Sequence, residues 1–374
     1  MITPVHEAAR DTVDVGAAAG VYPVFVGPDL LEHLPVVLST YAPTRRVAVI
    51  SDDEVGPIHG ASVVRTLADS GHDVTVLTFP AGEASKTRTS WSILTDGMLE
   101  AGLGRDCVVV AVGGGVTTDL AGFVAATYLR GVPIVHVPTS TLAMIDASVG
   151  GKTGVDVHAG KNLVGAFHAP RAVVADTTVL ATLERARRAE GLVEAVKHGA
   201  IRDEAHFGLV VERAESLIAA EPMACAEVVA ASVRLKAEVV AQDEFEEGVR
   251  QILNFGHTIG HAIEAAADYR IGHGRAVACG MIAEARLGEG LGVTEAGTAA
   301  CLIEALAPLT VRGEVDLDPT KARDFLGADK KSRDGQARYV LLRRIGEVAR
   351  DDGWTHEIDD EAAHAALEAV VRGW

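Results

Sequence analysis

The first half of the chain alternates short β-branched runs with amphipathic stretches of helical spacing. The apolar runs are brief and are bounded by Gly, Pro or Asp, which is typical of buried strands. Alternation of this kind predicts a mostly parallel sheet with helices on its faces. Strands are expected at residues 22–27, 46–52, 73–79, 107–112, 133–138 and 172–176, with helices at 60–70, 90–101 and 120–129 between some of them.

After about Thr177 the strand pattern fades and helical spacing replaces it. A chain of 374 residues exceeds what a single core usually supports, so we expect two domains. The first would be an α/β domain over residues 1–176, and the second an α-helical domain over 177–374. Helices are expected at 189–201, 205–219, 223–241, 250–267, 276–291, 296–306 and 361–371, with one small strand at 337–342.

The charge balance narrows the classes of partner. The formal net charge is −18, and no basic stretch offsets it, which disfavours nucleic acid and anionic membranes as partners. An anionic substrate would therefore need a local cluster of cations.

The N-terminal residues lack a basic segment followed by an apolar run, and the longest apolar runs are shorter than a membrane span. We expect a cytoplasmic protein.

A run of three glycines, 113–115, joins an expected strand to an expected helix. Such a turn lets backbone N–H groups approach phosphate oxygens, and the helix dipole favours an anion there. A tight turn without a ligand explains the glycines equally well. Loops after two other strands carry Glu83 and Lys86, and Thr139 and Ser140. Ligands bind at the carboxyl ends of such strands, so these loops favour a nucleotide.

Potential metal ligands occur in three segments of the second half. Imidazole and carboxylate groups form the ligand set that zinc and its neighbours accept. His257 and His261 are four residues apart and so share one side of their helix, and spacing alone would name them as the metal pair. The sequence leaves open which two histidines are ligands. The candidates are Glu190 and Glu194 on one helix, His257, His261 and Glu264 on another, and His273 before a third.

Basic side chains gather near these glycines and histidines. Taken singly, each is best explained as a solvated surface charge, and Arg130 as a cap on a helix C-terminus. Together, in an otherwise acidic chain, they indicate a local anion site. The set comprises Arg130, Lys152, Lys161, Lys236, Arg250, Lys330 and Lys331.

Four long segments closely resemble the 3-dehydroquinate synthase family, within the sugar phosphate cyclases. They are residues 113–170 (beginning GGGVTTDLAGF), 191–201 (GLVEAVKHGAI), 252–264 (ILNFGHTIGHAIE) and 329–342 (DKK…ARYVLL). The resemblance extends over roughly residues 22–345. It implies a dehydroquinate synthase-like fold, with a Rossmann-like NAD-binding domain, an all-α domain that binds metal and substrate, and usually a homodimer.

The resemblance also implies roles for individual residues. The metal, usually zinc with cobalt as an alternative, would be held by Glu194, His257 and His273, which splits the pair that spacing suggests and turns His261 toward a substrate phosphate. Arg130 would reach the partner subunit's site. NAD would contact Glu83, Lys86, Gly114, Gly115, Val116, Asp119, Thr139, Ser140, Lys152, Lys161 and Thr182. Substrate would contact Asp146, Lys152, Asn162, Lys197, Lys236, Arg250, Asn254, His261 and Lys330 or Lys331.

The implied reaction is the closure of a seven-carbon sugar-acid phosphate into a carbocycle. It combines transient oxidation by NAD, phosphate elimination, reduction and an intramolecular aldol step. Asp156 and Glu190 depart from the family pattern and add negative charge near the anion site.

Three alternatives remain. They are a secondary-metabolism cyclase of amino-dehydroquinate, valiolone or inosose type, a glycerol-dehydrogenase-like oxidoreductase, and a non-catalytic regulator. Lys236, Arg250 and Asn254 favour a carboxylate-bearing substrate, because two buried cations without an anion would be costly. An amino-analogue synthase would keep that carboxylate.

Overall fold

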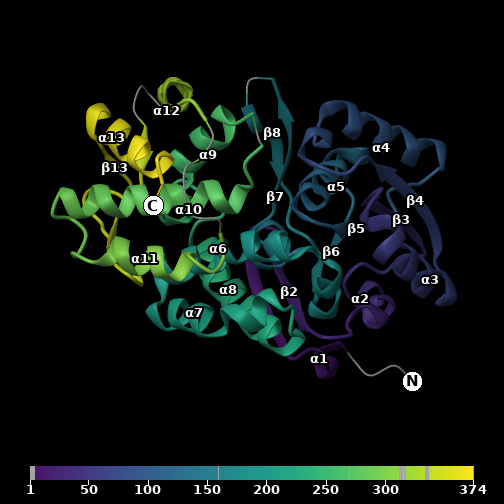
Figure 1. Cartoon of the computed structure of the whole chain (residues 1–374). Helices are drawn as coiled ribbons and strands as arrows, with labels where there is room; N and C mark the ends of the chain where they lie inside the picture. Colours follow the sequence, from purple (N-terminus) through teal and green to yellow (C-terminus); the bar gives the residue numbers. More distant parts are fainter. Residues whose placement is uncertain are drawn as a thin grey trace. The chain divides into compact units, whose positions relative to one another are not determined.

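The computed structural model describes residues 5–158, 160–268, 270–310, 315, 317–332 and 337–373, without the side chains of 327–332. These residues form two compact units, which Figure 1 colours along the chain. The first unit is Met1–Glu184 with Ala219–Glu244, and the second is Arg185–Ile218 with Phe245–Trp374. None of the described helices has the length and apolar character that a bilayer span requires.

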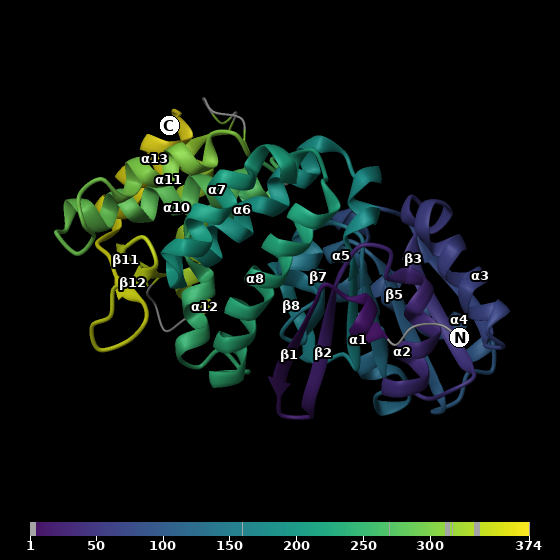
Figure 2. The same ribbon diagram turned by 90° about the horizontal axis from the view of Figure 1, so that it is seen from below.

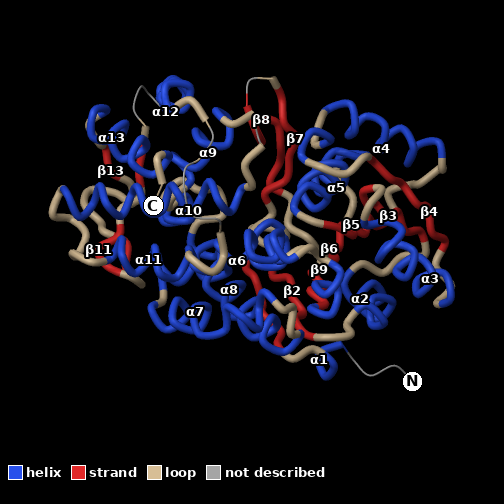
Figure 3. Tube along the Cα trace, viewed as in Figure 1, coloured by secondary structure: helices blue, strands red, loops and turns tan. Residues whose placement is uncertain are grey.

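A seven-stranded sheet organises the first unit (strands in red in Figure 3). Its order is β1-β2-β9-β6-β5-β3-β4, and the strands from β2 to β4 in that order are parallel while β1 pairs antiparallel with β2. All six predicted strands are confirmed, and β1 is an addition. The bounds are β1 Asp11–Ala17, β2 Gly20–Gly27, β3 Arg46–Asp52, β4 Asp73–Phe79, β5 Cys107–Gly113, β6 Ile134–Pro138 and β9 Ala172–Asp176.

Apolar cores cover both faces of this sheet. Alternate residues of β5 divide between them, with Val108 and Val110 in one core and Val109 and Ala111 in the other. A strand buried on both faces reads as a continuous apolar run, which is why the sequence signalled β5 so clearly. The helices of this unit are α1 Val5–Ala8, α2 Leu34–Tyr41, α3 Ala61–Asp69, α4 Arg88–Glu100, α5 Gly115–Thr127 and α8 Pro222–Gln242.

An antiparallel hairpin of β7, Lys152–Val157, and β8, Gly160–Phe167, was not predicted. Its strands carry Gly154 and Gly165 at facing positions, and glycine in a strand interior reads as a loop. A Cβ on Gly165 would lie 2.1 Å from the carbonyl oxygen of Thr153, so the two backbones approach too closely for a side chain. Lys152, Lys161 and Asn162 therefore lie on strands rather than in loops.

The division of the chain differs from the predicted boundary at residues 176 and 177. The first unit continues to Glu184 and also takes in α8, which packs beside β1 and β2 (Figure 2). Arg234 of α8 forms an ion pair with Asp11 of β1, and a Cβ on Gly16 would touch Ala241. The helical spacing of α8 was recognised, but sequence spacing does not reveal which sheet a helix covers.

The second unit is mainly helical, as predicted. The expected helix 250–267 is wrong in its first half: residues Val249–Asn254 form a 3₁₀ turn and α9 begins at His257. The expected strand 337–342 divides into β10 and β11, and α12 was not predicted. The bounds are α6 Arg185–Arg202, α7 Glu204–Ile218, α9 His257–Ala266, α10 His273–Gly290, α11 Thr298–Leu306, α12 Pro319–Ser332, α13 Asp360–Val371, β10 Arg338–Tyr339, β11 Leu342–Arg344, β12 Glu347–Val348 and β13 His356–Glu357.

Helices α9 and α10 cross at very close range through glycines. Gly256, which precedes α9, has φ +76°, a conformation that favours glycine. A Cβ on Gly280 of α10 would lie 1.9 Å from the Gly256 carbonyl oxygen. The buried carboxyl of Glu284, one turn further along α10, accepts a hydrogen bond from the Gly256 N–H at 2.8 Å. The start of α9 is thereby fixed against the middle of α10.

We expect Gly280→Ala to destabilise the second unit by about 1–3 kcal/mol, because the added methyl group overlaps the Gly256 backbone. The midpoint of urea denaturation measures the loss. Gly208→Ala on α7 is the matched control, since a Cβ there meets nothing within 4 Å and alanine stabilises a helix interior by up to about 1 kcal/mol. Equal midpoints for Gly280→Ala and the wild type would contradict the close crossing.

Candidate metal and nucleotide sites

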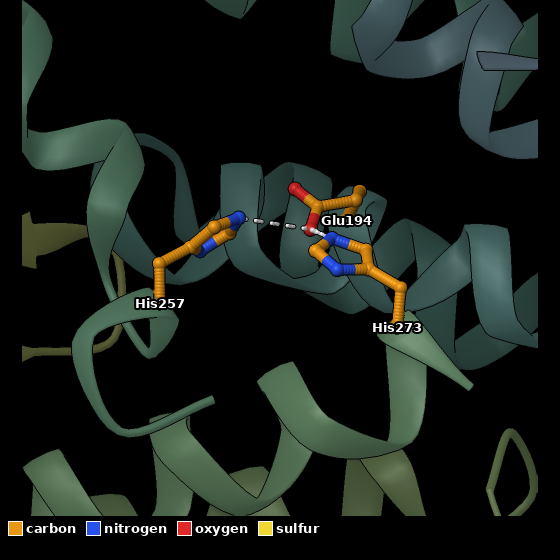
Figure 4. A group of neighbouring side chains, drawn as sticks. All are labelled: Glu194, His257 and His273. Atoms are coloured by element: carbon orange, nitrogen blue, oxygen red, sulfur yellow. Dashed lines mark ion pairs between the residues drawn. The ribbon is translucent and has the colours of Figure 1, made fainter. Parts of the chain in front are cut away.

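Glu194, His257 and His273, here called the metal triad, converge in the second unit. Glu194 lies on α6 and is fully buried, while the two histidines are the first residues of α9 and α10. Both imidazoles point at the carboxylate of Glu194 (Figure 4). The Nε2 atoms of His257 and His273 lie 3.7 Å and 3.4 Å from the same oxygen, Oε1. Two imidazoles and a carboxylate within 4.8 Å of one another form a ligand set that suits zinc.

The opposite ring nitrogens of both histidines are occupied. Nδ1 of His257 lies 3.2 Å from the carbonyl oxygen of Phe255, and Nδ1 of His273 lies 3.2 Å from Oε2 of Glu264. A neutral imidazole that donates from Nδ1 has its lone pair on Nε2. Both Nε2 atoms can therefore act as ligands at the point they already face, and this fits a divalent cation.

Electrostatics favours a cation at the same point. Burial lowers the pKa of His257 well below its usual range, and neighbouring Lys197 adds to the effect, so His257 is neutral as a ligand must be. Burial alone would lower the pKa of His273, but hydrogen bonds to Glu194 and Glu264 outweigh it and raise the pKa to about 10. The two carboxylates thus favour positive charge at this ring, and a cation that binds Nε2 would displace the proton there. Lys197 also forms an ion pair with Glu194, one turn away on α6.

The pair that spacing suggested, His257 and His261, is only partly reproduced. Their rings are adjacent, with centroids 5.1 Å apart, which confirms that they share a side of α9. However, His261 is exposed and groups with Glu264 and His273 rather than with Glu194. Spacing within one helix could not identify Glu194, because this candidate ligand comes from a helix more than fifty residues earlier.

In the first unit, the glycine turn lies where the sheet order changes direction. The chain leaves β3 toward β4 and leaves β5 toward β6, on opposite sides, so a crevice is expected at the carboxyl ends of β3 and β5. Helix α5 starts at Gly115 directly after β5. A Cβ on Gly114 would lie 3.3 Å from Oγ of Ser140, and the N–H of Thr139 donates to Gly113.

Five of the residues expected to contact NAD thus meet around one helix N-terminus. They are Gly114, Gly115 and Val116 at the start of α5, and Thr139 and Ser140 just after β6. A thirteen-residue helix preceded by glycine provides N–H donors and a favourable dipole for a pyrophosphate.

Asp52 was not singled out from the sequence, although it ends β3. Its buried carboxylate accepts from Thr117 of α5 and so joins the two edges of the crevice.

A second set of expected NAD residues forms a charge cluster around Lys86. The ammonium of this buried lysine lies 3.1 Å from Asp119, 3.2 Å from Glu83 and 3.8 Å from Asp156, and Lys161 lies 3.5 Å from Glu83. Burial opposes the charge of Lys86, but the carboxylates outweigh it and hold the pKa well above its usual range. Asp156, which departs from the family pattern, is thus part of the Lys86 cluster.

Lys236 of α8 is buried and donates to both the carbonyl and the carboxylate of Asp146, at 2.6 and 2.5 Å. Its charge is therefore balanced by Asp146, and burial of Lys236 does not by itself require a substrate carboxylate.

Thr182, another residue expected to contact NAD, hydrogen-bonds to His59 at 2.7 Å, a partner that no sequence signal identified. The side chains of Lys152, Asn162 and Arg130 are exposed.

The remaining expected substrate residues lie in the second unit. Arg250 is almost fully buried in the 3₁₀ turn before α9. Asn254 donates to the carboxylate of Glu246 at 2.6 Å, and Glu246 was missed because it lies in an acidic run where nothing distinguishes it. The side chains of Lys330 and Lys331 lie outside the described residues.

Two family models match the chain. The model described as 3-dehydroquinate synthase N-terminal matches residues 76–190, and the model described as 3-dehydroquinate synthase C-terminal matches residues 191–332. A 3-dehydroquinate synthase of Symbiobacterium thermophilum is 44% identical over 356 residues, which cover 94% of this chain and 98% of that protein.

Solved structures give the same picture of the fold. A 2-deoxy-scyllo-inosose synthase complexed with carbaglucose-6-phosphate, NAD⁺ and Co²⁺ has a TM-score of 0.88 at 26% identity, covering 97% of this chain and all of that one. The 2-epi-5-epi-valiolone synthase of Streptomyces hygroscopicus subsp. jinggangensis 5008, with NAD⁺ and Zn²⁺ bound, has a TM-score of 0.83 at 29% identity, covering 93% and 96%.

We expect Lys86→Met to destabilise the first unit by up to about 3 kcal/mol, because it leaves Asp119 without its cation. Burial raises the pKa of Asp119 and Lys86 lowers it, to about 6 in the wild type. Without Lys86 this pKa rises further above the unfolded value of about 3.9. The folded variant then holds a proton that the unfolded chain has lost, so its free energy of unfolding falls as pH rises from 6 to 8.

Urea denaturation across that pH range measures this effect. Lys161→Met is the control, because this lysine is less buried than Lys86 and forms an ion pair with Glu83. Parallel pH profiles for Lys86→Met and the wild type would show that Asp119 does not depend on Lys86.

Proposed function

Because the chain belongs to the 3-dehydroquinate synthase family, we propose that it converts 3-deoxy-D-arabino-heptulosonate 7-phosphate into 3-dehydroquinate and phosphate in the shikimate pathway. The observation that carries this proposal is the metal triad: a buried carboxylate and two imidazoles aimed at one point, in a chain 44% identical to a 3-dehydroquinate synthase. The enzyme is a phosphate-eliminating lyase.

We assign zinc to the metal triad. Three protein ligands that leave further positions for substrate oxygens are typical of catalytic zinc. The Zn²⁺ in the valiolone synthase structure and the Co²⁺ in the inosose synthase structure support a divalent ion in this fold. Bound metal would polarise substrate oxygens, and bound NAD⁺ would take up and return a hydride.

The residues of the chain then have distinct tasks. The N-terminus of α5 binds the pyrophosphate of NAD, and Thr139 and Ser140 line the same turn. Glu83, Lys86, Asp119 and Lys161 of the Lys86 cluster form one wall of the cofactor site, and Thr182 completes it. His261 contacts the substrate phosphate, and Arg250 and Asn254 contact its carboxylate. Lys152, Asn162, Asp146, Lys197, Lys236 and Lys330 or Lys331 hold the remaining oxygens.

Sequence identity favours this substrate over those of the related cyclases. The chain is 44% identical to the 3-dehydroquinate synthase but 26% and 29% identical to the inosose and valiolone synthases, although all share the fold. The family resemblance assigns Arg250 and Asn254 to the carboxylate of the substrate, and the chain carries both. An amino analogue of the substrate keeps that anion and is the second candidate.

We further propose a cytoplasmic homodimer in which Arg130 reaches the partner subunit. The exposed side chain of Arg130 supports this role, and so does its backbone. Leu129 and Arg130 both have positive φ, 49° and 69°, and this conformation costs a non-glycine residue roughly 1–2 kcal/mol. A strained segment that presents an arginine outward is typical of a functional contact.

Phosphate release from the seven-carbon acid phosphate tests the reaction. We expect the wild type to release phosphate with no net change in NADH absorbance, a chelator to stop release, and added Zn²⁺ to restore it. His257→Ala should abolish release, because the cation loses one of its ligands. His364→Ala is the control, since this histidine of α13 lies in none of the described ligand groups.

Two results would oppose the proposal. Net NADH formation would indicate a glycerol-dehydrogenase-like oxidoreductase. Phosphate release from a neutral sugar phosphate, without release from the acid phosphate, would indicate an inosose- or valiolone-type cyclase.

A further inference from the structure

We propose that Glu264 is a positioning residue for the metal: its carboxylate holds the His273 ring with Nδ1 protonated, so that Nε2 faces the cation. The inference rests on the metal site of the proposed function. It adds to the three ligands a residue that acts only through one of them.

The backbone of His273 is fixed independently of its ring. A Cβ on Gly272 would lie 1.6 Å from Oε1 of Glu190, and a Cβ on Gly274 would lie 2.4 Å from the Glu190 carbonyl oxygen. The residues on either side of His273 are thus packed directly against α6. These contacts determine where the His273 side chain starts but not how its ring is turned.

The ring itself has less packing around it. The His273 side chain is 29% exposed, compared with 14% for His257. A partly exposed imidazole can rotate about both of its side-chain torsions unless a hydrogen bond holds it. Oε2 of Glu264, 3.2 Å from Nδ1, supplies that bond. Glu264 is itself 3% exposed and lies two turns beyond His257 on α9, so it is well placed to hold the ring.

The ring of His257 is held by a backbone group instead of a side chain. Its Nδ1 faces the carbonyl oxygen of Phe255, two residues earlier. That carbonyl precedes the left-handed Gly256, whose N–H donates to the buried Glu284. One histidine is therefore held by a carbonyl and the other by a carboxylate, which are the usual acceptors for histidines that bind metal through the other nitrogen.

Glu264 could alternatively be a ligand, since Glu264, His261 and His273 form a second group within ligand distance of one another. The geometry favours the positioning role. Glu194 lies at Nε2 of His273 and Glu264 at Nδ1, on opposite edges of one ring. A single cation binds only one nitrogen of an imidazole, and His257 also points toward the Glu194 side.

The test is the affinity of the stripped protein for Zn²⁺, measured against a chromophoric chelator without substrate or NAD. We expect Glu264→Ala to weaken binding by about 10–100-fold, the usual effect of removing such a partner. Glu264→Gln keeps an acceptor for the Nδ1 proton and should recover most of the loss. His261→Ala should bind Zn²⁺ nearly as tightly as the wild type.

Glu289→Ala is the matched control. Its carboxylate, on α10, accepts a hydrogen bond from the N–H of Ala299, so the variant loses a comparable contact at the far end of the same helix. The visible spectrum of the Co²⁺-loaded protein gives a second measurement. It should shift in Glu264→Ala and remain unchanged in Glu289→Ala. A merely structural role would lower the urea midpoint in both variants without changing affinity or spectrum.

The outcomes separate the inference from the proposed function. A wild type that binds no Zn²⁺ would refute the proposed function itself. Equal Zn²⁺ affinities of Glu264→Ala and the wild type would refute only the positioning role. Equal losses in Glu264→Ala, Glu264→Gln and His261→Ala would make Glu264 a ligand and also overturn the inference. If Glu264→Ala does not fold, Glu264→Met decides, because it fills similar space without an acceptor for the Nδ1 proton: weaker Zn²⁺ binding with a shifted Co²⁺ spectrum supports the role, and wild-type affinity and spectrum contradict it.

Discussion

The buried carboxylate of Glu194 is the constraint on which the second unit depends. A fully desolvated anion is costly unless cations or polar groups surround it, and here the ammonium of Lys197 and two imidazole rings meet it. The close glycine crossing of α9 and α10 serves this requirement, because His257 and His273 are the first residues of those helices. Hydrogen bonds at both Nδ1 atoms complete the arrangement by leaving both Nε2 atoms toward Glu194.

In the first unit the central buried charge is positive rather than negative. Lys86 is a buried cation surrounded by carboxylates, and those carboxylates come from the turn after β4, from α5 and from the hairpin. One ammonium therefore ties three segments together beside the glycine turn. Lys86 and Lys161 together face three carboxylates, so this cluster has no surplus of cations. The N–H groups and the dipole at the N-terminus of α5 are the features of this turn that favour an anion.

Much of the fold could be predicted from residue patterns, because parallel strands buried on both faces leave continuous apolar runs. The glycine-rich hairpin was not predicted, because Gly154 and Gly165 weaken the strand pattern. The placement of α8 in the first unit was not predicted either, because helical spacing does not specify which sheet a helix covers. At the site, helical spacing placed His257 beside His261 but could not find Glu194, which comes from another helix. The partners Glu246, His59 and Asp52 depend on tertiary contacts that no local pattern encodes.

X-ray absorption at the zinc edge of the metal-loaded protein tests the central claim most directly. The account predicts one zinc per chain with two imidazole nitrogens and one carboxylate oxygen among its nearest neighbours, and loss of one imidazole in His273→Ala. A first shell that contains three imidazoles, or that keeps both imidazoles in His273→Ala, would show that the cation does not bind at Glu194, His257 and His273.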